Sequence, residues 1–296
     1  MEGMNGVIVL DKPGGCSSHD AVQRMRRLAR TKRVGHLGTL DPLATGVLPL
    51  VIGKATRLSK FFLGHDREYE ASVRLGFATS TYDRDGDALS EPASADVGMD
   101  DVENALSRYL GTIRQRPPAV SAKKIAGVPA YKRVRRQEKV ELDPVEVTIY
   151  DLKLLSLCGN EFRIRLRTSA GAYVRSLAHD LGQDLGCGGH VAELRRTSMG
   201  QFSVGNARTF EQLEEMQDGG RLEEALIPPE QLLPEIPVCR VDTATAGRIA
   251  HGQEFHVSSF SQFATAERVK AVGPDGELLA IGELKLPGAY HPAIVF

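Results

Sequence analysis

The stretch GHLGTLDPLATGVL, residues 35–48, places a single carboxylate in an apolar setting. Leu40 and Leu43 are among several side chains that can anchor the stretch in a core. Three glycines allow sharp turns or the close approach of a ligand, and Pro42 disfavours helical backbone at Asp41. The sequence therefore predicts that Asp41 stands on a fixed, extended loop. Because a carboxylate in apolar surroundings has a raised pKa unless a cation lies beside it, we expect an arginine from elsewhere in the chain to pair with Asp41.

Further motifs lie on both sides of this loop. DKPGGCSS occupies residues 11–18, GAYVRSL residues 171–177 and GCGGHVAELRR residues 186–196. The loop itself fits the pattern G-H-x-G-x-L-D-P-x-A-x-G-x-L at every fixed position. With these motifs the chain resembles the TruB family of bacterial tRNA pseudouridine-55 synthases. The resemblance covers essentially the whole chain and is looser in its last part, from about residue 237.

Three catalytic residues follow from the resemblance. It implies that Asp41 is the nucleophile, that Tyr69 stacks on the target base, and that Arg175 is the cation required beside Asp41. Without the motifs, Tyr69 is typical of the edge of a core and Arg175 of a salt bridge on a helix surface. An aspartate before proline is, in the same way, most often a structural turn residue.

The resemblance also implies four substrate-binding residues. Lys12 lies beside the active site, and Tyr173 packs next to Arg175. Leu194 packs against the flipped base, while His36 fills the space that the base leaves in the RNA. For three of the four an ordinary structural role stays open: a surface lysine in a turn, a core leucine and a hydrogen-bonded loop histidine.

Charge is segregated along the chain, although the net charge is only −1. Residues 21–34 hold six basic residues and no acidic one, and residues 121–140 hold seven basic and one acidic. This pattern favours a basic face toward a polyanion, with solvated charged helices as the alternative. The segment at about 112–143 resembles the family's RNA-gripping insertion, a kind of contact suited to RNA backbone and stacking. The residues expected on the RNA backbone are Lys123, Lys124, Lys132, Arg133, Arg195 and Arg196.

Periodicity predicts an α+β fold. Apolar and polar residues alternate over residues 69–77 and 161–169, which indicates half-buried strands. A helix from residue 174 to Leu181 is expected to end at Gly182. The resemblance specifies the pseudouridine-synthase fold, with a mixed, mainly antiparallel sheet and flanking helices.

Two domains are expected. A proline-rich stretch around residues 227–237 separates a catalytic domain, residues 1–233, from a PUA-like RNA-binding β-barrel, residues 237–296. Within the second domain, residues 269–284 predict a hairpin around a Gly-Pro-Asp-Gly turn.

Composition argues against metal, redox and membrane chemistry. The four cysteines are scattered without a C-x-x-C pair, and the eight histidines show no metal-ligand spacing. No apolar run approaches the ~20 residues of a membrane span. We therefore expect a cytoplasmic protein without metal, cofactor or membrane contact. We also expect a monomer without an obligatory protein partner, and the family resemblance implies that its partner is the T-arm of tRNA.

The implied reaction turns uridine into pseudouridine at position 55, in the T-arm (TΨC) loop of tRNAs. The uridine is flipped out of its stack, and one carboxylate nucleophile suffices because nothing is oxidised and no group is imported. Whether Asp41 attacks C6 of the uracil or C1′ of the ribose is left open. The rivals are a glycosidic-bond hydrolase, which usually needs two carboxylates, and a noncatalytic RNA-binding or tRNA-folding module, in which Asp41 is dispensable.

Overall fold

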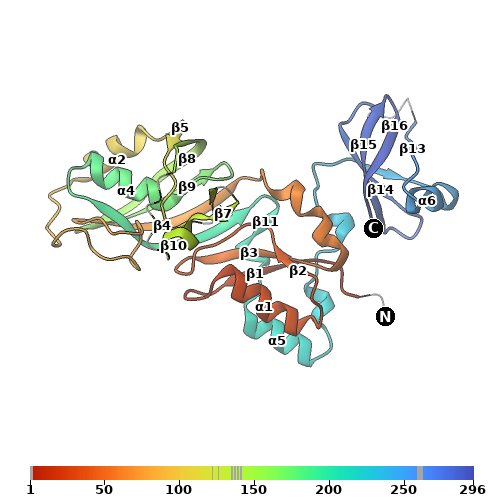
Figure 1. The fold of residues 1–296 in the computed structure, drawn as a ribbon, viewed down its shortest axis with the longest axis horizontal. Coiled ribbons are helices and arrows are strands. Elements are labelled where there is room, and N and C mark those ends of the chain that lie inside the picture. The colour runs from red at the N-terminus through yellow and green to blue at the C-terminus, as the bar shows by residue number, and fades with distance from the viewer. Residues whose placement is uncertain are drawn as a thin grey trace.

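The chain folds around two β-sheets that lie apart in the molecule (Figure 1). The computed structural model describes residues 3–121, 123–125, 127–134, 136, 138, 140, 142–258 and 263–296. Within these residues the larger sheet has nine strands. They are β1 (Gly6–Lys12), β2 (Val34–His36), β3 (Thr45–Ile52), β4 (Arg67–Leu75), β5 (Gly111–Gln115), β8 (Val145–Cys158), β9 (Glu161–Thr168), β10 (Gly189–Met199) and β11 (Phe202–Ser203).

The large sheet is mixed and mainly antiparallel, which confirms the prediction. Its order is β1-β3-β10-β4-β9-β8-β5, with β2 added to β3 and β11 added to β10. Only β3 and β10 run parallel, and their register is limited to Thr45 opposite Arg195 and Gly46 opposite Arg196. Gly46 has φ +97°, and a Cβ there would lie 2.2 Å from the Arg196 carbonyl oxygen, so only glycine fits. This short pairing joins the first half of the sheet, β1, β2 and β3, to the second half, which begins with β10.

The strands of the second half bury one face and expose the other. In β9, Phe162, Ile164 and Leu166 are buried, while the arginines between them point outward, as the alternation predicts. Helices α2 (Met99–Ser107) and α4 (Val174–Asp184) contact β8 and β10, respectively. The remaining short elements are η1 (Gly53–Phe62), β6 (Lys124–Ile125), β7 (Val128–Pro129), α3 (Ala130–Val134), η2 (Val204–Asn206), α5 (Phe210–Asp218), η3 (Leu222–Ala225) and η4 (Pro229–Gln231).

Helix α1 (Ser18–Leu28) supports the first half of the sheet and begins beside the Asp41 loop. Ser17 caps it in a capping box with Asp20. Its buried side chains include Met25, and the helix contacts β2 and β3. The Ser18 hydroxyl accepts a hydrogen bond from Leu40 N at 2.8 Å and donates one to Leu40 O at 3.0 Å. The start of α1 is thereby fixed to the residue that precedes Asp41.

Helix α4 does not end where the sequence predicts. The helix continues through Gly182 to Asp184, so the prediction that Gly182 terminates it is wrong. A Cβ at Gly182 would lie 2.1 Å from the backbone nitrogen of Gly189. This glycine therefore allows α4 to pack closely against the start of β10, and it does not act as a helix stop.

A small β domain follows, as predicted. Its five-stranded sheet has the order β12-β14-β15-β16-β13, with the predicted hairpin formed by β14 and β15. Val272, Leu278 and Ile281 share an apolar cluster with Leu58 and Phe62 of η1, which attaches this domain to the rest of the chain. The elements are β12 (Val238–Arg240), α6 (Thr243–Ala250), β13 (Phe255–His256), β14 (Arg268–Val272), β15 (Leu278–Leu286) and β16 (Ala289–Val295).

Candidate active site

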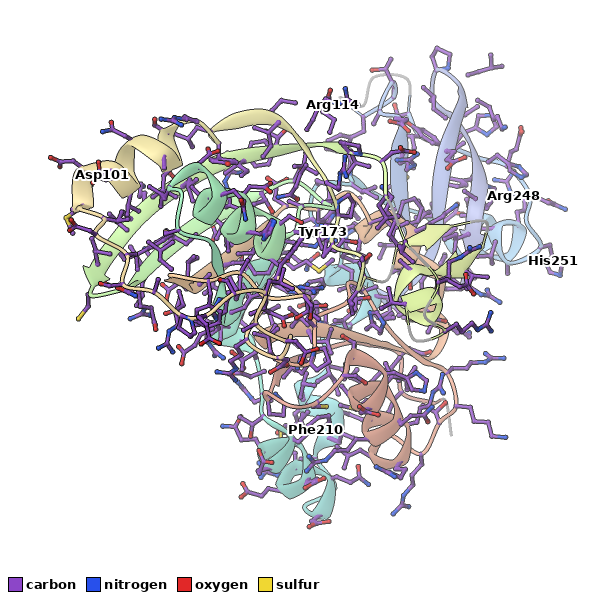
Figure 2. The ribbon with its side chains drawn as sticks, turned by 60° about the vertical axis from the view of Figure 1, so that its left-hand side comes forward. Asp101, Arg114, Tyr173, Phe210, Arg248 and His251 are labelled. Atoms are coloured by element: carbon purple, nitrogen blue, oxygen red, sulfur yellow. The ribbon has the colours of Figure 1, made fainter. Side chains whose placement is uncertain are left out.

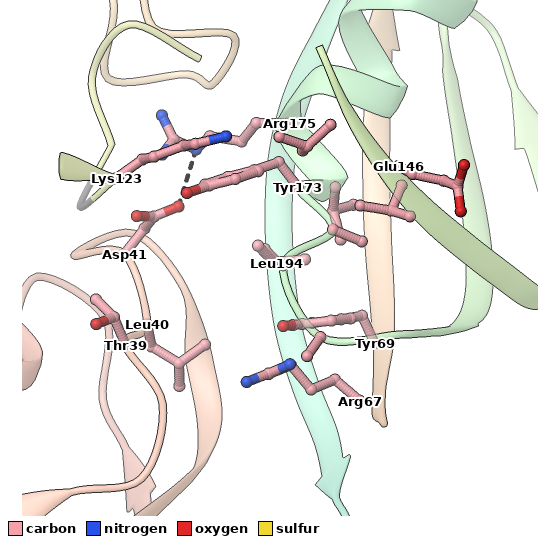
Figure 3. Close-up of a pocket in the computed structure, with 16 residues that line it drawn as sticks. Thr39, Leu40, Asp41, Arg67, Tyr69, Lys123, Glu146, Tyr173, Arg175 and Leu194 are labelled. Atoms are coloured by element: carbon pink, nitrogen blue, oxygen red, sulfur yellow. Dashed lines mark ion pairs between the residues drawn. The ribbon is translucent and has the colours of Figure 1, made fainter. Parts of the chain in front are cut away.

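A pocket of about 520 Å³ opens between the Asp41 loop and the second half of the large sheet (Figure 3). Segments far apart in the sequence form its walls, and Tyr173 lies near the middle of the molecule, away from Arg248 and His251 of the C-terminal domain (Figure 2). The lining segments are residues 39–41 of the loop, Arg67 and Tyr69 of β4, Lys123, residues 145–147, residues 170–175 and Leu194 of β10.

Asp41 forms an ion pair with Arg175, as expected for a carboxylate in an apolar setting. Asp41 Oδ2 lies 2.8 Å from Nε of Arg175, and this ion pair confirms the pairing expected from the sequence. The Asp41 side chain is 32% exposed and lines the pocket, whereas that of Arg175 is only 3% exposed. The buried guanidinium thus stabilises a carboxylate that a ligand in the pocket can reach.

Arg175 is held on its other side by groups that sequence reasoning missed. Its Nη1 lies 3.3 Å from Oδ2 of Asp83 and donates to the Thr81 carbonyl at 2.9 Å. Its Nη2 donates to the carbonyl of Val120 at 3.0 Å. The carboxylate of Asp83 is only 7% exposed. No sequence signal marks Asp83 as a partner, because the aspartate-rich segment at residues 79–87 gives no indication that it folds back onto α4.

Tyr69 and Leu194 face the same pocket from neighbouring strands. Both are 7% exposed, and the register of β4 and β10 sets Leu194 opposite Ala71 and Tyr69 opposite Arg196. Figure 3 shows them across the pocket from Asp41. Tyr69, Leu194 and Asp41 thus bound one space, as the motifs predict.

Tyr173 completes this wall at the start of α4. Its backbone nitrogen and carbonyl bond to the side-chain amide of Gln115, at 2.8 and 3.0 Å. Burial raises the pKa of its hydroxyl group. The phenol therefore stays protonated at neutral pH and presents a neutral hydroxyl to the pocket.

Lys12 does not line the pocket, so its expected place among the substrate-binding residues is wrong. The side chain is fully buried, and burial lowers its pKa. Its Nζ donates to the carbonyl oxygens of Pro13, Cys16 and Pro42, at 2.8, 2.6 and 3.4 Å. Lys12 therefore fixes the backbone next to Asp41 from the buried side of the loop, through its hydrogen bond to Pro42.

Arg196 is likewise wrong as a contact to the RNA backbone. It is fully buried, and burial lowers its pKa. Nε donates to Val47 O at 2.7 Å, and the two terminal nitrogens donate to Gly38 O at 3.0 Å and Thr39 O at 3.4 Å. These carbonyls belong to both ends of the Asp41 loop and point inward, so they need buried donors. Arg196 supplies them and is not available to a phosphate.

The other expected RNA contacts lie in varied settings. Arg195 is partly exposed and pairs with Asp11 at 2.7 Å, a hydrogen bond that raises the pKa of its guanidinium. Lys123 lines the pocket, and Arg133 forms a 3.3 Å ion pair with Glu138. The side chains of Lys124 and Lys132 lie outside the part that the structure describes.

His36 stands in β2, just before the Asp41 loop, and is half-buried. Burial lowers its pKa, and the charge of Arg196 lowers it further, so a neutral imidazole is favoured. It does not line the pocket. The structure therefore places His36 next to the loop without bringing it into contact with the space beside Asp41.

Arg67 is a further pocket residue that sequence reasoning missed. It stands two residues before Tyr69 in β4, and residues at this spacing share one face of a strand. This spacing is the sequence signal that could have placed Arg67 beside Tyr69 in the pocket. Its Nη1 donates to the carbonyl of His65 at 3.2 Å. No carboxylate of the described residues forms an ion pair with Arg67, so it brings a positive charge to the pocket.

Neither a metal cluster nor a membrane-spanning helix is found in the described part of the chain. No three histidine, cysteine, aspartate or glutamate side chains gather as metal ligands among the residues that the structure covers. Among those same residues, no helix is long and apolar enough to cross a membrane.

The fold and the pocket define a pseudouridine synthase. A solved Cbf5–Nop10–Gar1 complex contains a chain that matches 96% of this protein at a TM-score of 0.72 and 26% identity, over 80% of that chain. An H/ACA ribonucleoprotein bound to a substrate RNA containing 2′-deoxyuridine matches 99% at a TM-score of 0.74 and 25% identity, over 85% of that chain.

Sequence comparison identifies the family. Residues 26–174 match the model of the TruB family pseudouridylate synthase N-terminal domain, and residues 175–234 match the tRNA pseudouridylate synthase B C-terminal domain. A protein of Solibacter usitatus named tRNA pseudouridine synthase B is 51% identical over 99% of this chain and 100% of its own length. One of the same name from Aquifex aeolicus is 39% identical over 95% of this chain and 96% of its own. The chain belongs to the TruB family and is a pseudouridylate synthase.

Proposed function

We propose that this enzyme converts the uridine at position 55, in the T-arm loop of tRNA, into pseudouridine, with Asp41 as the nucleophile. The observation that carries the proposal is the position of Asp41 on the pocket wall, paired with Arg175 at 2.8 Å and facing Tyr69 and Leu194. The names of the curated relatives support tRNA as the substrate. The four pocket residues stand at the positions that the family motifs assign to catalysis and base binding.

The reaction is an isomerisation. The bond between N1 of the uracil and C1′ of the ribose breaks, the uracil rotates, and C5 joins C1′. C5 then loses a proton and N1 gains one, so no oxidant, reductant or transferred group is needed. Asp41 forms a transient covalent bond with one of the two fragments, to C6 of the uracil or to C1′ of the ribose. This bond breaks again when the product is complete, so that the carboxylate is regenerated.

The pocket accommodates the base once it is flipped out. Unstacking costs a few kcal/mol, which stacking and pocket contacts offset. Tyr69 and Leu194 bound the space opposite Asp41, so an aromatic ring and an apolar side chain can enclose the planar uracil. Arg175 holds the Asp41 carboxylate in a fixed direction, because its guanidinium is buried and bound on both sides. His36 fills the place that the base leaves in the RNA.

The remaining parts of the chain grip the RNA. Residues 1–233 form the catalytic domain, in which the basic insertion at about 112–143 reaches the pocket through Lys123. Residues 237–296 form a PUA-like RNA-binding domain. The enzyme works as a monomer, without an obligatory protein partner.

A tritium-release assay tests the proposal. Transcript tRNA labelled at C5 of its uridines should release tritium with the wild-type enzyme, and a transcript with cytidine at position 55 should release none. Asp41→Asn should bind the tRNA but release nothing. Free uracil among the products would instead indicate a hydrolase. Full turnover by Asp41→Asn would show that Asp41 is dispensable and refute the proposed nucleophile.

A further inference from the structure

A basic surface lies at the end of α1 and on the turn after it, outside the pocket. It consists of Arg26, Arg27, Arg30, Lys32 and Arg33. A hollow of about 560 Å³ is lined by four of these cations together with Gln23 and Thr31, and no acidic residue lines it.

Most of this positive charge is not neutralised. Arg24, one turn earlier, pairs with Glu214 at 2.8 Å, and Arg26 donates to the carbonyl of Val34 at 3.1 Å. By contrast, the structure shows no carboxylate, among the residues it describes, that pairs with Arg27 or with any of the three cations that follow the helix. All four are exposed: Arg27, Arg30, Lys32 and Arg33.

The helix alone does not explain this surface. Cations in the last turn of a helix interact favourably with its dipole, which accounts for Arg26 and Arg27. Arg30, Lys32 and Arg33 lie beyond the last turn, where that benefit falls off. Arg30 also adopts φ +48°, a conformation uncommon for residues other than glycine. Like charges gathered in this way repel one another unless an anion binds between them.

The position of the surface connects it with the pocket. Helix α1 starts at Ser18, whose hydroxyl is bonded twice to Leu40 of the Asp41 loop. Its 11 residues, at 1.5 Å each, carry the chain about 16 Å from that loop. The turn then leads into β2 and back to the loop. A nucleic-acid duplex carries one negative charge per about 1.7 Å of axis, so a stem covering this distance carries about nine.

We propose that this basic surface binds the phosphate backbone of a helical stem of the same RNA whose uridine enters the pocket. The proposal rests on the proposed function, because that function brings the RNA to the Asp41 loop. Long, exposed arginine and lysine side chains without a rigid groove suit phosphate contacts that do not depend on base sequence. The surface therefore adds affinity and orientation for the stem, while the pocket selects the uridine.

The double variant Arg27→Gln/Lys32→Gln tests the surface. Both side chains are exposed and neither lines the pocket, so the fold and the turnover at saturating RNA should persist. Each lost phosphate contact lowers the slope of log affinity against log salt by about one. Binding of a tRNA transcript, measured between 50 and 200 mM salt, should therefore lose about two units of slope, with a higher KM at low salt and an unchanged kcat.

A control with the same charge change is Arg74→Gln/Arg108→Gln, because both arginines are exposed on other parts of the molecule. This control should keep the wild-type slope. Equal slopes in the wild type and the first double variant, or equal losses in both double variants, would overturn the basic surface as an RNA site. Pseudouridine formation by the wild type in the same transcript reports separately on the proposed function. A loss that also occurs on an isolated T-arm hairpin assigns the surface to that stem, and a loss on full-length tRNA alone assigns it to another.

Discussion

Nη1 of Arg175 lies 3.3 Å from Oδ2 of Asp83, and both side chains are almost fully buried. The same guanidinium contacts Asp41 through Nε at 2.8 Å. Arg175 is therefore placed between an accessible carboxylate and a buried one. Because a buried arginine needs its charge compensated, Asp83 fixes the orientation in which Arg175 contacts Asp41, and it acts as a positioning residue.

Replacing Asp83 with asparagine should lower turnover without weakening RNA binding. The new amide can keep the hydrogen bond to Thr81 but presents N–H groups to Arg175, so the guanidinium shifts. A displacement of about 1 Å at a reacting group can reduce the rate on the order of 100-fold. Steady-state kinetics should show a kcat about 10- to 100-fold lower, with an unchanged Kd for tRNA. Asp85→Asn is the matched control, since its side chain is 59% exposed, and it should react like wild type. An unchanged kcat for Asp83→Asn would show that Arg175 needs no second carboxylate.

Replacing Arg196 with methionine should destabilise the protein. The change leaves the carbonyls of Gly38, Thr39 and Val47 without their donor. An unsatisfied buried polar group costs about 1–3 kcal/mol, so the free energy of unfolding should fall by at least about 3 kcal/mol. Urea denaturation measures this. Arg195→Met, the neighbouring substitution, removes a partly exposed ion pair and should cost only about 0–1 kcal/mol. Equal losses in the two variants would contradict the role of Arg196 in holding the loop.

Replacing Arg67 with glutamine should raise KM more than it lowers kcat. Arg67 lines the pocket and pairs with no carboxylate in the described parts of the chain, so an RNA phosphate is the partner that its charge fits. Loss of one phosphate contact should reduce the salt slope of tRNA binding by about one. Arg67→Lys should restore much of that slope, because it restores the charge. A lower kcat at unchanged affinity would instead place Arg67 among the groups that act on the uracil.

The sequence was sufficient where a pattern reports directly on burial or on a motif. Alternation predicts β9, and the apolar setting of Asp41 together with the G-x-Y-x-R motif predicts Arg175 as its partner. The sequence was not sufficient where the direction of a backbone carbonyl decides whether a cationic side chain is buried or exposed. The motifs predict that Lys12 and Arg196 are cations that contact the RNA. In the structure both are buried, because they donate hydrogen bonds to inward-pointing carbonyls of the Asp41 loop. No residue pattern records which way those carbonyls point.

Packing between elements distant in sequence was the second feature that could not be predicted from the sequence. Asp83 reaches Arg175 only because the turn at residues 79–87 folds over α4, and the close packing of β10 against α4 leaves no room for a Cβ at Gly182. Both depend on how elements distant in sequence meet. The sequence therefore supplied the motif residues of the site, and the structure added Asp83 and Arg67 to them.

Asp180, on α4, carries an unfavourable charge that should appear as a pH-dependent stability. Burial and the charge of nearby Asp184 together raise its pKa to about 6, although Arg116 opposes the shift. In the unfolded chain the pKa of an aspartate is about 3.9. The native state therefore holds this proton more tightly, so the stability that the group contributes is fully present below about pH 4 and is lost as the pH rises through 6.

Asp180→Asn removes this titration, because asparagine is neutral at every pH. Its Tm should exceed that of the wild type by about 2–4 °C at pH 7.5, which corresponds to about 1 kcal/mol once the partial exposure of the side chain is allowed for. At pH 4 the gap should be much smaller, because Asp180 is then protonated in the native state and about half protonated in the unfolded chain. Asp218→Asn, an exposed position on α5, is the control and should show no gap at either pH. A difference between Asp180→Asn and wild type that is the same at pH 4 and pH 7.5 would mean that packing, and not ionisation, sets the stability at this position.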